Sequence, residues 1–412
     1  MKKLNRRTLL SPKVLPTLIV LAAVIVLAFV PNFYENDVYG YYDRCKAEVL
    51  SVDNEGLTQA GLIVYGLQSC EVKLLDGDFK GEVYHATNLL EGKMESDKLF
   101  EPGDKALVLI GGTTDGTVVT EGGKPIVSMI DHYRFNYELI MVIGFALLLI
   151  IMARGIGARA ILSFAFTILC IWKIMIPMYL SGYNAIAVGF LITATTSSAI
   201  IILVYGFNRR FIAAISGNLL GTGITAILAI IFVHLMNIHG AVIPYAESLL
   251  YAGYTNVDLT EIFIASIFVA SSGALTDVAV DITSAINEVV TVHPNIGRKR
   301  AIHSGLNVGR AVLGTMATTL LLAYSGGYIG LLMVFVAQGT PVECILNYRF
   351  VSAEILHTMV GSFGLITVVP FTAFTAGLLL HDHPEPVDDD SLGFLEDETE
   401  KELPPTKSPQ SE

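Results

Sequence analysis

The stretch YELIMVIGFALLLIIMA, residues 137–153, decides the fold, because it holds a single charged residue among seventeen. A helix of this length is about 26 Å long, close to the roughly 30 Å of hydrocarbon in a bilayer. The stretch therefore predicts a membrane-spanning helix.

Seven other apolar stretches resemble it: 14–30, 160–180, 185–206, 211–237, 259–282, 309–337 and 353–380. The whole chain is 53% hydrophobic and 16% charged, with a mean hydropathy of +0.59, whereas soluble domains are about 45–50% apolar and 25% charged. The predicted fold class is an α-helical polytopic membrane protein with about eight transmembrane helices, about seven of them in 137–380. SGGYIG interrupts 309–337. We expect one broken helix there, and two short spans would instead move the C-terminus to the other side.

Basic residues predict the orientation of these helices. They cluster in 1–13, at Arg154 and Arg159, at Arg209 and Arg210, and in 298–310, whereas the alternate loops have almost none. Both termini are therefore predicted to be cytoplasmic, with 14–30 acting as an uncleaved signal anchor. Residues 381–412 hold eleven acidic residues and two lysines, so this tail carries most of the net charge of −12. Such a composition predicts a disordered acidic cytoplasmic tail.

Residues 31–136 differ from the rest of the chain. Short β-like runs such as GLIVYGLQSCEVKLL and KALVLI alternate with turn signals such as DGD and EPGD. The segment predicts a small extracytoplasmic all-β domain, either a barrel or a sandwich, inserted after the first helix. Cys45 and Cys70 lie in it. Outside the cytoplasm they could form a disulfide, and two buried free thiols are the alternative.

The densest polar signal in the apolar region is SSGALTDVAVDITSAINEVV, residues 271–290. Asp277, Asp281, Ser284 and Glu288 are four, three and four residues apart, which places them on one face of a helix. A charged side chain at the bilayer centre costs about 2.5–3.5 kcal/mol. Carboxylates on such a face are therefore expected to be paired, protonated or bound to a cation.

The next predicted helix begins with a second polar stripe. His303, Asn307 and Arg310 repeat the four-then-three spacing, so we expect a polar and basic stripe that faces the acidic one. Two interpretations follow. In the first, a cation or proton site is formed by Asp277, Asp281, Ser284, Glu288 and Asn307, with Arg310 and His303 as charge partners. In the second, Asp277 and Asp281 simply pair with Arg310 near the cytoplasmic membrane edge.

Lys173, Asn218 and Glu354 are further polar residues within predicted spans. Lys173 is expected either to extend its amine to the membrane interface or to pair with Glu354 or Glu261. Asn218 either hydrogen-bonds a neighbouring helix or lines a path through the membrane.

Several motifs are missing from the sequence. It has no Walker A motif, no H-E-x-x-H and no G-x-S-x-G. An ATP-driven pump is therefore not expected in this chain, nor is an enzyme or a bound cofactor. Because no Cys/His metal-ligand spacing occurs, the sequence names no metal.

The sequence resembles the YibE/F-like family of bacterial membrane proteins. The resemblance is carried by GALTDVAVDITSAINEV, HSGLNVGRAVLGTMATTLLLAYSGG and VSAEILHTMVGSFGLITVVPFTA. It implies a multi-spanning bacterial protein, and a permease is the activity it suggests. The residues that match the family pattern are Gly273, Asp277, Asp281, Glu288, Asn307, Arg310, Glu354 and Pro370.

The leading hypothesis is a transporter or permease of the bacterial cell membrane that is not ATP-driven by itself and moves a cation or a proton-coupled solute. The alternative is a non-transporting scaffold or sensor whose β domain binds an envelope partner. The expected partners are the lipid bilayer, a small cation or solute, and either a second copy of the chain or an envelope protein. Nucleic acid is not an expected partner.

Overall fold

The computed structural model describes residues 14–32, 42–94, 96–111, 120–121 and 124–381. They belong to two compact units, Asn32–Met152 and the remainder of the chain. The basic N-terminus and, apart from His381, the acidic tail lie outside the described residues.

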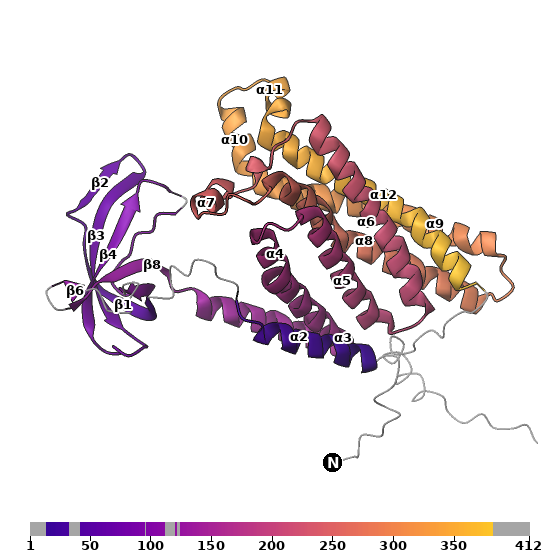
Figure 1. Ribbon diagram of the computed structural model, residues 1–412, viewed down its shortest axis with the longest axis horizontal. Coiled ribbons are helices and arrows are strands. Elements are labelled where there is room, and N and C mark those ends of the chain that lie inside the picture. Colours follow the sequence, from indigo (N-terminus) through magenta and orange to yellow (C-terminus); the bar gives the residue numbers. More distant parts are fainter. Residues whose placement is uncertain (1–13, 33–41, 95, 112–119, 122–123, 382–412) are drawn as a thin grey trace, which may run out of the picture. The chain divides into compact units, whose positions relative to one another are not determined.

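The first unit contains a β-barrel (Figure 1). Its strands are β1 (Asp43–Asp53), β2 (Leu57–Ala60), β3 (Ile63–Leu74), β4 (Val83–Glu91), β5 (Lys105–Ile110) and β8 (Val127–His132). The sheet order is β1-β5-β8-β4-β3-β2, and an additional pairing of β1 with β3 closes it. Only β4 and β8 pair in parallel. β2 pairs only with β3, so the other five strands close the ring. A closed five-stranded barrel with these pairings is an OB-fold, so the predicted β domain is a barrel and not a sandwich. A separate pair is formed by β6 (Thr120–Glu121) and β7 (Lys124–Pro125).

Alternating burial explains how these strands close around a core. Every second residue of β4 is buried, and Val72, Ala86 and Val108 are fully buried, as expected for strands with one face inside. Gln68 and Asn88 are also buried, and they bond to each other and to the carbonyls of Phe100 and Lys98. These hydrogen bonds hold the segment that connects β4 to β5 against strands β3 and β4.

A disulfide between Cys45 and Cys70 does not form. Cys70 pairs with Val52 across β1 and β3, and Cys45 lies seven residues further along β1. At about 3.3 Å per residue the two cysteines are on the order of 20 Å apart, whereas a disulfide needs Cα atoms within about 7 Å. Both are buried free thiols.

The rest of the chain is helical. Its elements are α2 (Val14–Phe29), α3 (Phe135–Cys170, whose first half lies in the barrel's unit), the π-helical turn Ile171–Met175, α4 (Ile176–Leu180), α5 (Ala185–Tyr205), α6 (Arg209–Leu235), the 3₁₀ turn η2 (Gly240–Val242), α7 (Ala246–Tyr251), α8 (Leu259–Val292), α9 (Arg298–Ser325), the 3₁₀ turn Gly326–Tyr328, α10 (Ile329–Ala337), α11 (Val342–Asn347) and α12 (Arg349–Leu379).

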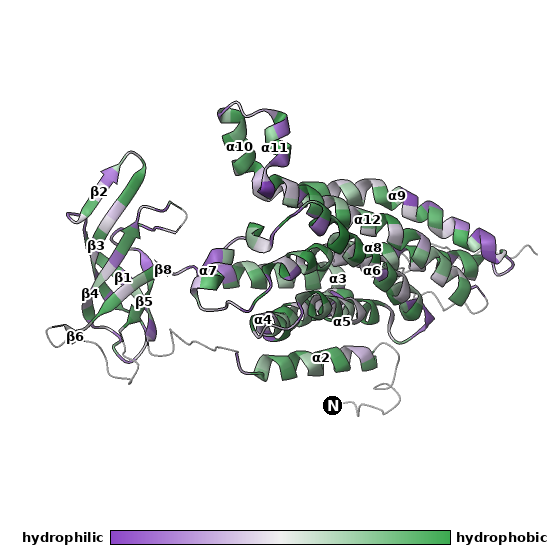
Figure 2. Cartoon of the chain, turned by 45° about the horizontal axis from the view of Figure 1, so that its top comes forward, coloured by the Kyte–Doolittle hydropathy of each residue, from purple (hydrophilic) through white to green (hydrophobic). Residues whose placement is uncertain are grey.

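In the described residues, six helical stretches are long and apolar enough to cross a membrane: Phe135–Leu180, Ala185–Tyr205, Arg209–Leu235, Leu259–Val292, Arg298–Ala337 and Arg349–Leu379. Figure 2 shows hydrophobic residues along them. The predictions 137–153 and 160–180 fall within one stretch of 46 residues. Its backbone leaves the helical conformation at Arg154, where φ is 46° and ψ is −123°.

The polar segments are more helical than their hydropathy predicted. The structure extends α8 to Val292 and starts α9 at Arg298, so both helices continue beyond the apolar stretches 259–282 and 309–337, as the helical spacing of the two polar stripes predicted. A hydropathy pattern places the end of a membrane span where charged residues begin, although the helix itself and its backbone hydrogen bonds continue past that point. The two polar stripes are therefore parts of regular helices.

Small residues hold the centre of the helical unit together. Gly217 and Gly221 of α6 lie against Thr372 and Val368 of α12, and Thr225 lies against Gly364. Side chains this small let two backbones approach closely. In the same unit α8 packs against α5, α6, α9 and α12, which positions its polar face.

Candidate functional site

The acidic face of α8 is uncovered in the helical unit. Asp277, Asp281, Ser284 and Glu288 are all exposed, whereas Val278 and Ile282 beside them are fully buried. The structure thus confirms that the four polar residues share one helix face.

Tyr205, the last residue of α5, marks the depth of this face. Its hydroxyl donates to the Val280 carbonyl at 2.6 Å and lies 2.7 Å from Ser284 Oγ. Asp277 is seven residues further into the bundle, about 10 Å at 1.5 Å per residue. The acidic face therefore runs inward from the end of the helical unit that holds Tyr205, which we call the Tyr205 end.

The predicted facing of the two polar stripes is wrong. At the contact between the helices, Gly305 of α9 lies against Ile286 and Gly309 lies against Ile282. These isoleucines are on the buried side of α8, while His303, Asn307 and Arg310 are exposed. The two glycines determine which face of α9 contacts α8, because only a residue without a side chain lets the helices approach this closely. Both polar stripes therefore lie outside the contact between the two helices.

Arg310 consequently does not neutralise the aspartates. Its Nη1 donates to Asn307 Oδ1 of its own helix at 3.2 Å. No ion pair in the described part of the chain involves Arg310. Simple pairing of Asp277 and Asp281 with Arg310, one of the two interpretations of the stripe, is therefore not what the structure shows.

The other intramembrane polar residues are also placed. Asn218 is fully buried on α6, and neither of its side-chain polar atoms has a hydrogen-bond partner among the described residues. A buried amide without partners is costly, so Asn218 remains a candidate lining residue. Lys173 donates to the Val30 carbonyl at 2.8 Å, and the structure joins it to neither Glu261 nor Glu354.

Sequence reasoning missed a pocket around Glu354. The cavity has a volume of about 360 Å³ and lies among α8, α9, α12 and the residues around η2. Glu354 and His357, one turn apart on α12, line it together with Tyr324 and Tyr328. The Tyr324 ring lies against His357 with centroids 4.6 Å apart.

Three buried polar atoms of this pocket lack a partner among the described residues. They are Glu354 Oε1, His357 Nε2 and the Tyr324 hydroxyl. The sequence signal that could have found them is the Glu354-x-x-His357 spacing, which puts both side chains on one helix face. Tyr324 comes from another helix, and no local pattern links it to them.

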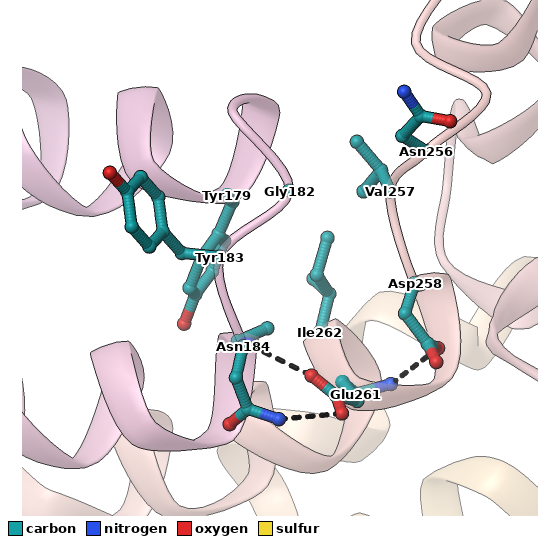
Figure 3. A pocket seen from close by; sticks show the side chains of 10 residues that line it. Tyr179, Gly182, Tyr183, Asn184, Asn256, Val257, Asp258, Glu261 and Ile262 are labelled. Atoms are coloured by element: carbon teal, nitrogen blue, oxygen red, sulfur yellow. Dashed lines mark hydrogen bonds between the residues drawn. The ribbon is translucent and has the colours of Figure 1, made fainter.

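A second pocket, of about 270 Å³, lies where α5 and α8 begin (Figure 3). Figure 3 shows the Glu261 carboxylate hydrogen-bonded to Asn184. It accepts from Asn184 Nδ2 at 2.6 Å and from the Ala185 backbone N–H at 2.9 Å. Asp258 caps α8 by accepting from the backbone of Thr260 and Glu261. Both carboxylates thus satisfy helix N-termini, which accounts for them without a ligand. We call this end of the helical unit the Glu261 end.

The chemistry available in these places is binding of positive charge. Within the described residues, no group of three or more His, Cys, Asp or Glu could hold a metal ion. The acidic face offers three carboxylates at the Tyr205 end, and the Glu354 pocket offers one carboxylate with hydrogen-bonding neighbours nearer the other end.

Comparison with sequence families gives one assignment. Residues 141–382, more than half of the 412 residues, match the family described as YibE/F-like protein. Searches among curated proteins and among solved structures find no match. The match covers the α8 acidic face, the α9 stripe and the Glu354 pocket. On this match and its apolar helices, the chain belongs to the YibE/F-like family of membrane proteins.

Proposed function

We propose that this chain is a transporter or permease of the bacterial cell membrane that moves a cation or a proton-coupled solute and does not hydrolyse ATP itself. The observation that carries the proposal is the acidic face of α8. Asp277 and Asp281 lie on an apolar helix, are exposed, and receive no ion pair from Arg310. Uncompensated carboxylates within a membrane span mark ion and proton pathways.

The proposed topology has eight spans with both termini in the cytoplasm. The 46 residues of Phe135–Leu180 would be about 69 Å long, more than twice the hydrocarbon thickness, and the break at Arg154 supports two spans there. With α2, the remaining five long helices bring the number to eight. The nine residues of α10 extend only about 14 Å, which favours one interrupted helix over two short spans. In this topology the Tyr205 end is cytoplasmic and the barrel is extracytoplasmic.

Flux into proteoliposomes tests the function. Asp277→Asn together with Asp281→Asn removes two negative charges but keeps the side-chain size, so we expect cation or proton flux to fall at least tenfold. Glu343→Gln, an exposed glutamate on α11, is the matched control and should keep full flux. Unchanged flux in the double variant would remove the α8 face from the pathway.

A second candidate function rests on the barrel. Leu62, Leu89 and Met94 are 83%, 66% and 69% exposed, and Leu62 and Met94 line a groove of about 180 Å³. Exposed apolar patches often mark protein interfaces. In this alternative the chain is a scaffold or sensor whose barrel binds an envelope protein. Loss of a co-purified envelope protein in Leu62→Ser with Met94→Ser, together with no measurable flux, would favour it.

A further inference from the structure

We infer that the pocket around Glu354 binds a small protonated organic amine. Glu354 is the only charged residue that lines the cavity apart from the titratable His357. Transfer of an unpaired carboxylate from water into a membrane domain is costly, and a cationic ligand offsets that cost.

The unpartnered atoms match an ammonium group. Glu354 Oε1 accepts, the Tyr324 hydroxyl has lone pairs, and a neutral His357 with its proton on Nδ1 has a lone pair on Nε2. An ammonium carries three N–H donors and no acceptor. An ammonium bound at the Glu354 carboxylate would therefore have two further acceptor residues, Tyr324 and His357, in the lining of the same pocket.

The walls of the pocket suit the organic part of such a ligand. Phe263, Tyr324 and Tyr328 place aromatic rings around the cavity, and Ile262, Ile243 and Pro244 add aliphatic surface. Aromatic faces attract cations by about 0.5–2 kcal/mol. The volume of about 360 Å³ falls within the usual range for small-molecule sites.

A divalent inorganic cation fits less well. Calcium takes six to eight oxygen ligands and magnesium takes octahedral geometry with several retained waters. The pocket supplies one carboxylate, and no group of three acidic, histidine or cysteine residues exists among the described residues. As a step in transport this site rests on the proposed function, whereas the binding itself does not.

Calorimetric titration of the purified full-length chain in nanodiscs tests the inference, with benzylammonium chloride as the probe. We expect Glu354→Gln to weaken its binding at least tenfold and Tyr324→Phe, which removes only the hydroxyl, to weaken it about threefold. Glu343→Gln is the control and should bind like the wild type. Equal binding by Glu354→Gln and the wild type would overturn the inference.

A comparison on the wild-type chain keeps the test valid if Glu354→Gln does not fold. Benzyl alcohol has nearly the same shape as benzylammonium but no charge, so it should bind at least tenfold more weakly. Equally tight binding of the alcohol would overturn the inference. Titration needs no gradient. If the chain binds the amine but shows no flux, the amine site stands and the proposed transport function is contradicted. If the chain shows flux but does not bind the amine, the transport function stands and the amine site is contradicted.

Discussion

Two single glycines explain why the polar stripes of α8 and α9 do not face each other as the sequence predicted. The spacing of Asp277, Asp281, Ser284 and Glu288 was enough to place them on one face, because helical periodicity is local. Which neighbour that face meets depends on Gly305 and Gly309, which select another side of α8 for contact. The contact of Tyr324 with His357 was missed for a similar reason, since the two residues are on different helices.

Hydroxyl residues show where local reasoning is sufficient. Thr195, Thr196 and Ser198 donate to the carbonyls four residues earlier in α5, as a run of hydroxyls in an apolar helix predicts. Ser197 is different, because its hydroxyl accepts from Thr276 of α8 at 3.2 Å. Contacts within a helix could be predicted from the sequence, and contacts between helices could not.

The barrel cysteines give a prediction at this scale. Burial raises the pKa of the Cys70 thiol to about 11 and also raises the pKa of the Cys45 thiol, with Asp76 adding to the effect at Cys45. The thiolate is the reactive form, so both should resist alkylation at pH 8 in the native chain. We expect each to react only after denaturation, as counted by mass spectrometry. A native Cys45–Cys70 crosslink, or fast native alkylation of either residue, would contradict the barrel register.

At the scale of elements, the contact between α6 and α12 depends on small residues. A Cβ on Gly217 would lie 2.7 Å from Thr372 Cα, which is backbone and cannot move aside, whereas a Cβ on Gly223 would meet nothing within 4 Å. Hydropathy identified both helices but not this seam, because glycine contributes little to it.

Two alanine variants test the seam. Gly217→Ala should lower the free energy of unfolding by about 1–3 kcal/mol through overpacking, and Gly223→Ala should be neutral or stabilising by up to about 1 kcal/mol through helix propensity. Denaturant unfolding of the purified chain in detergent compares them. Equal effects of the two alanines would show that α6 and α12 do not pack closely here.

The Glu261 contact joins two elements at their N-termini. Because its carboxylate accepts from Asn184 and Ala185 of the α5 N-terminus, Glu261→Ala would leave these donors without their acceptor. We expect a loss of about 1–3 kcal/mol in the free energy of unfolding. Glu247→Ala, at an exposed position on α7, is the control and should change stability by less than about 0.5 kcal/mol.

At the scale of the whole molecule, the sequence predicted the main division of the chain into a β domain and apolar helices. It also located the acidic face. It did not predict the OB-fold strand order, since long-range pairings such as β1 with β5 are not encoded in local periodicity. The Glu354 pocket likewise needed the folded structure, because it is assembled from segments more than 100 residues apart.

If the α8 acidic face is part of a cation or proton pathway with the Tyr205 end in the cytoplasm, water reaches Asp277 from that side. In a variant without native cysteines, Asp277→Cys can be compared with Ile366→Cys, which is 53% exposed on α12. The two sites lie at the same depth, because Gly364 contacts Leu275. Asp277 is two residues after Leu275, and Ile366 is two residues after Gly364. A charged, membrane-impermeant thiol reagent applied to inside-out vesicles should label Asp277→Cys at least tenfold faster than Ile366→Cys. Equal and slow labelling of both positions would contradict the account.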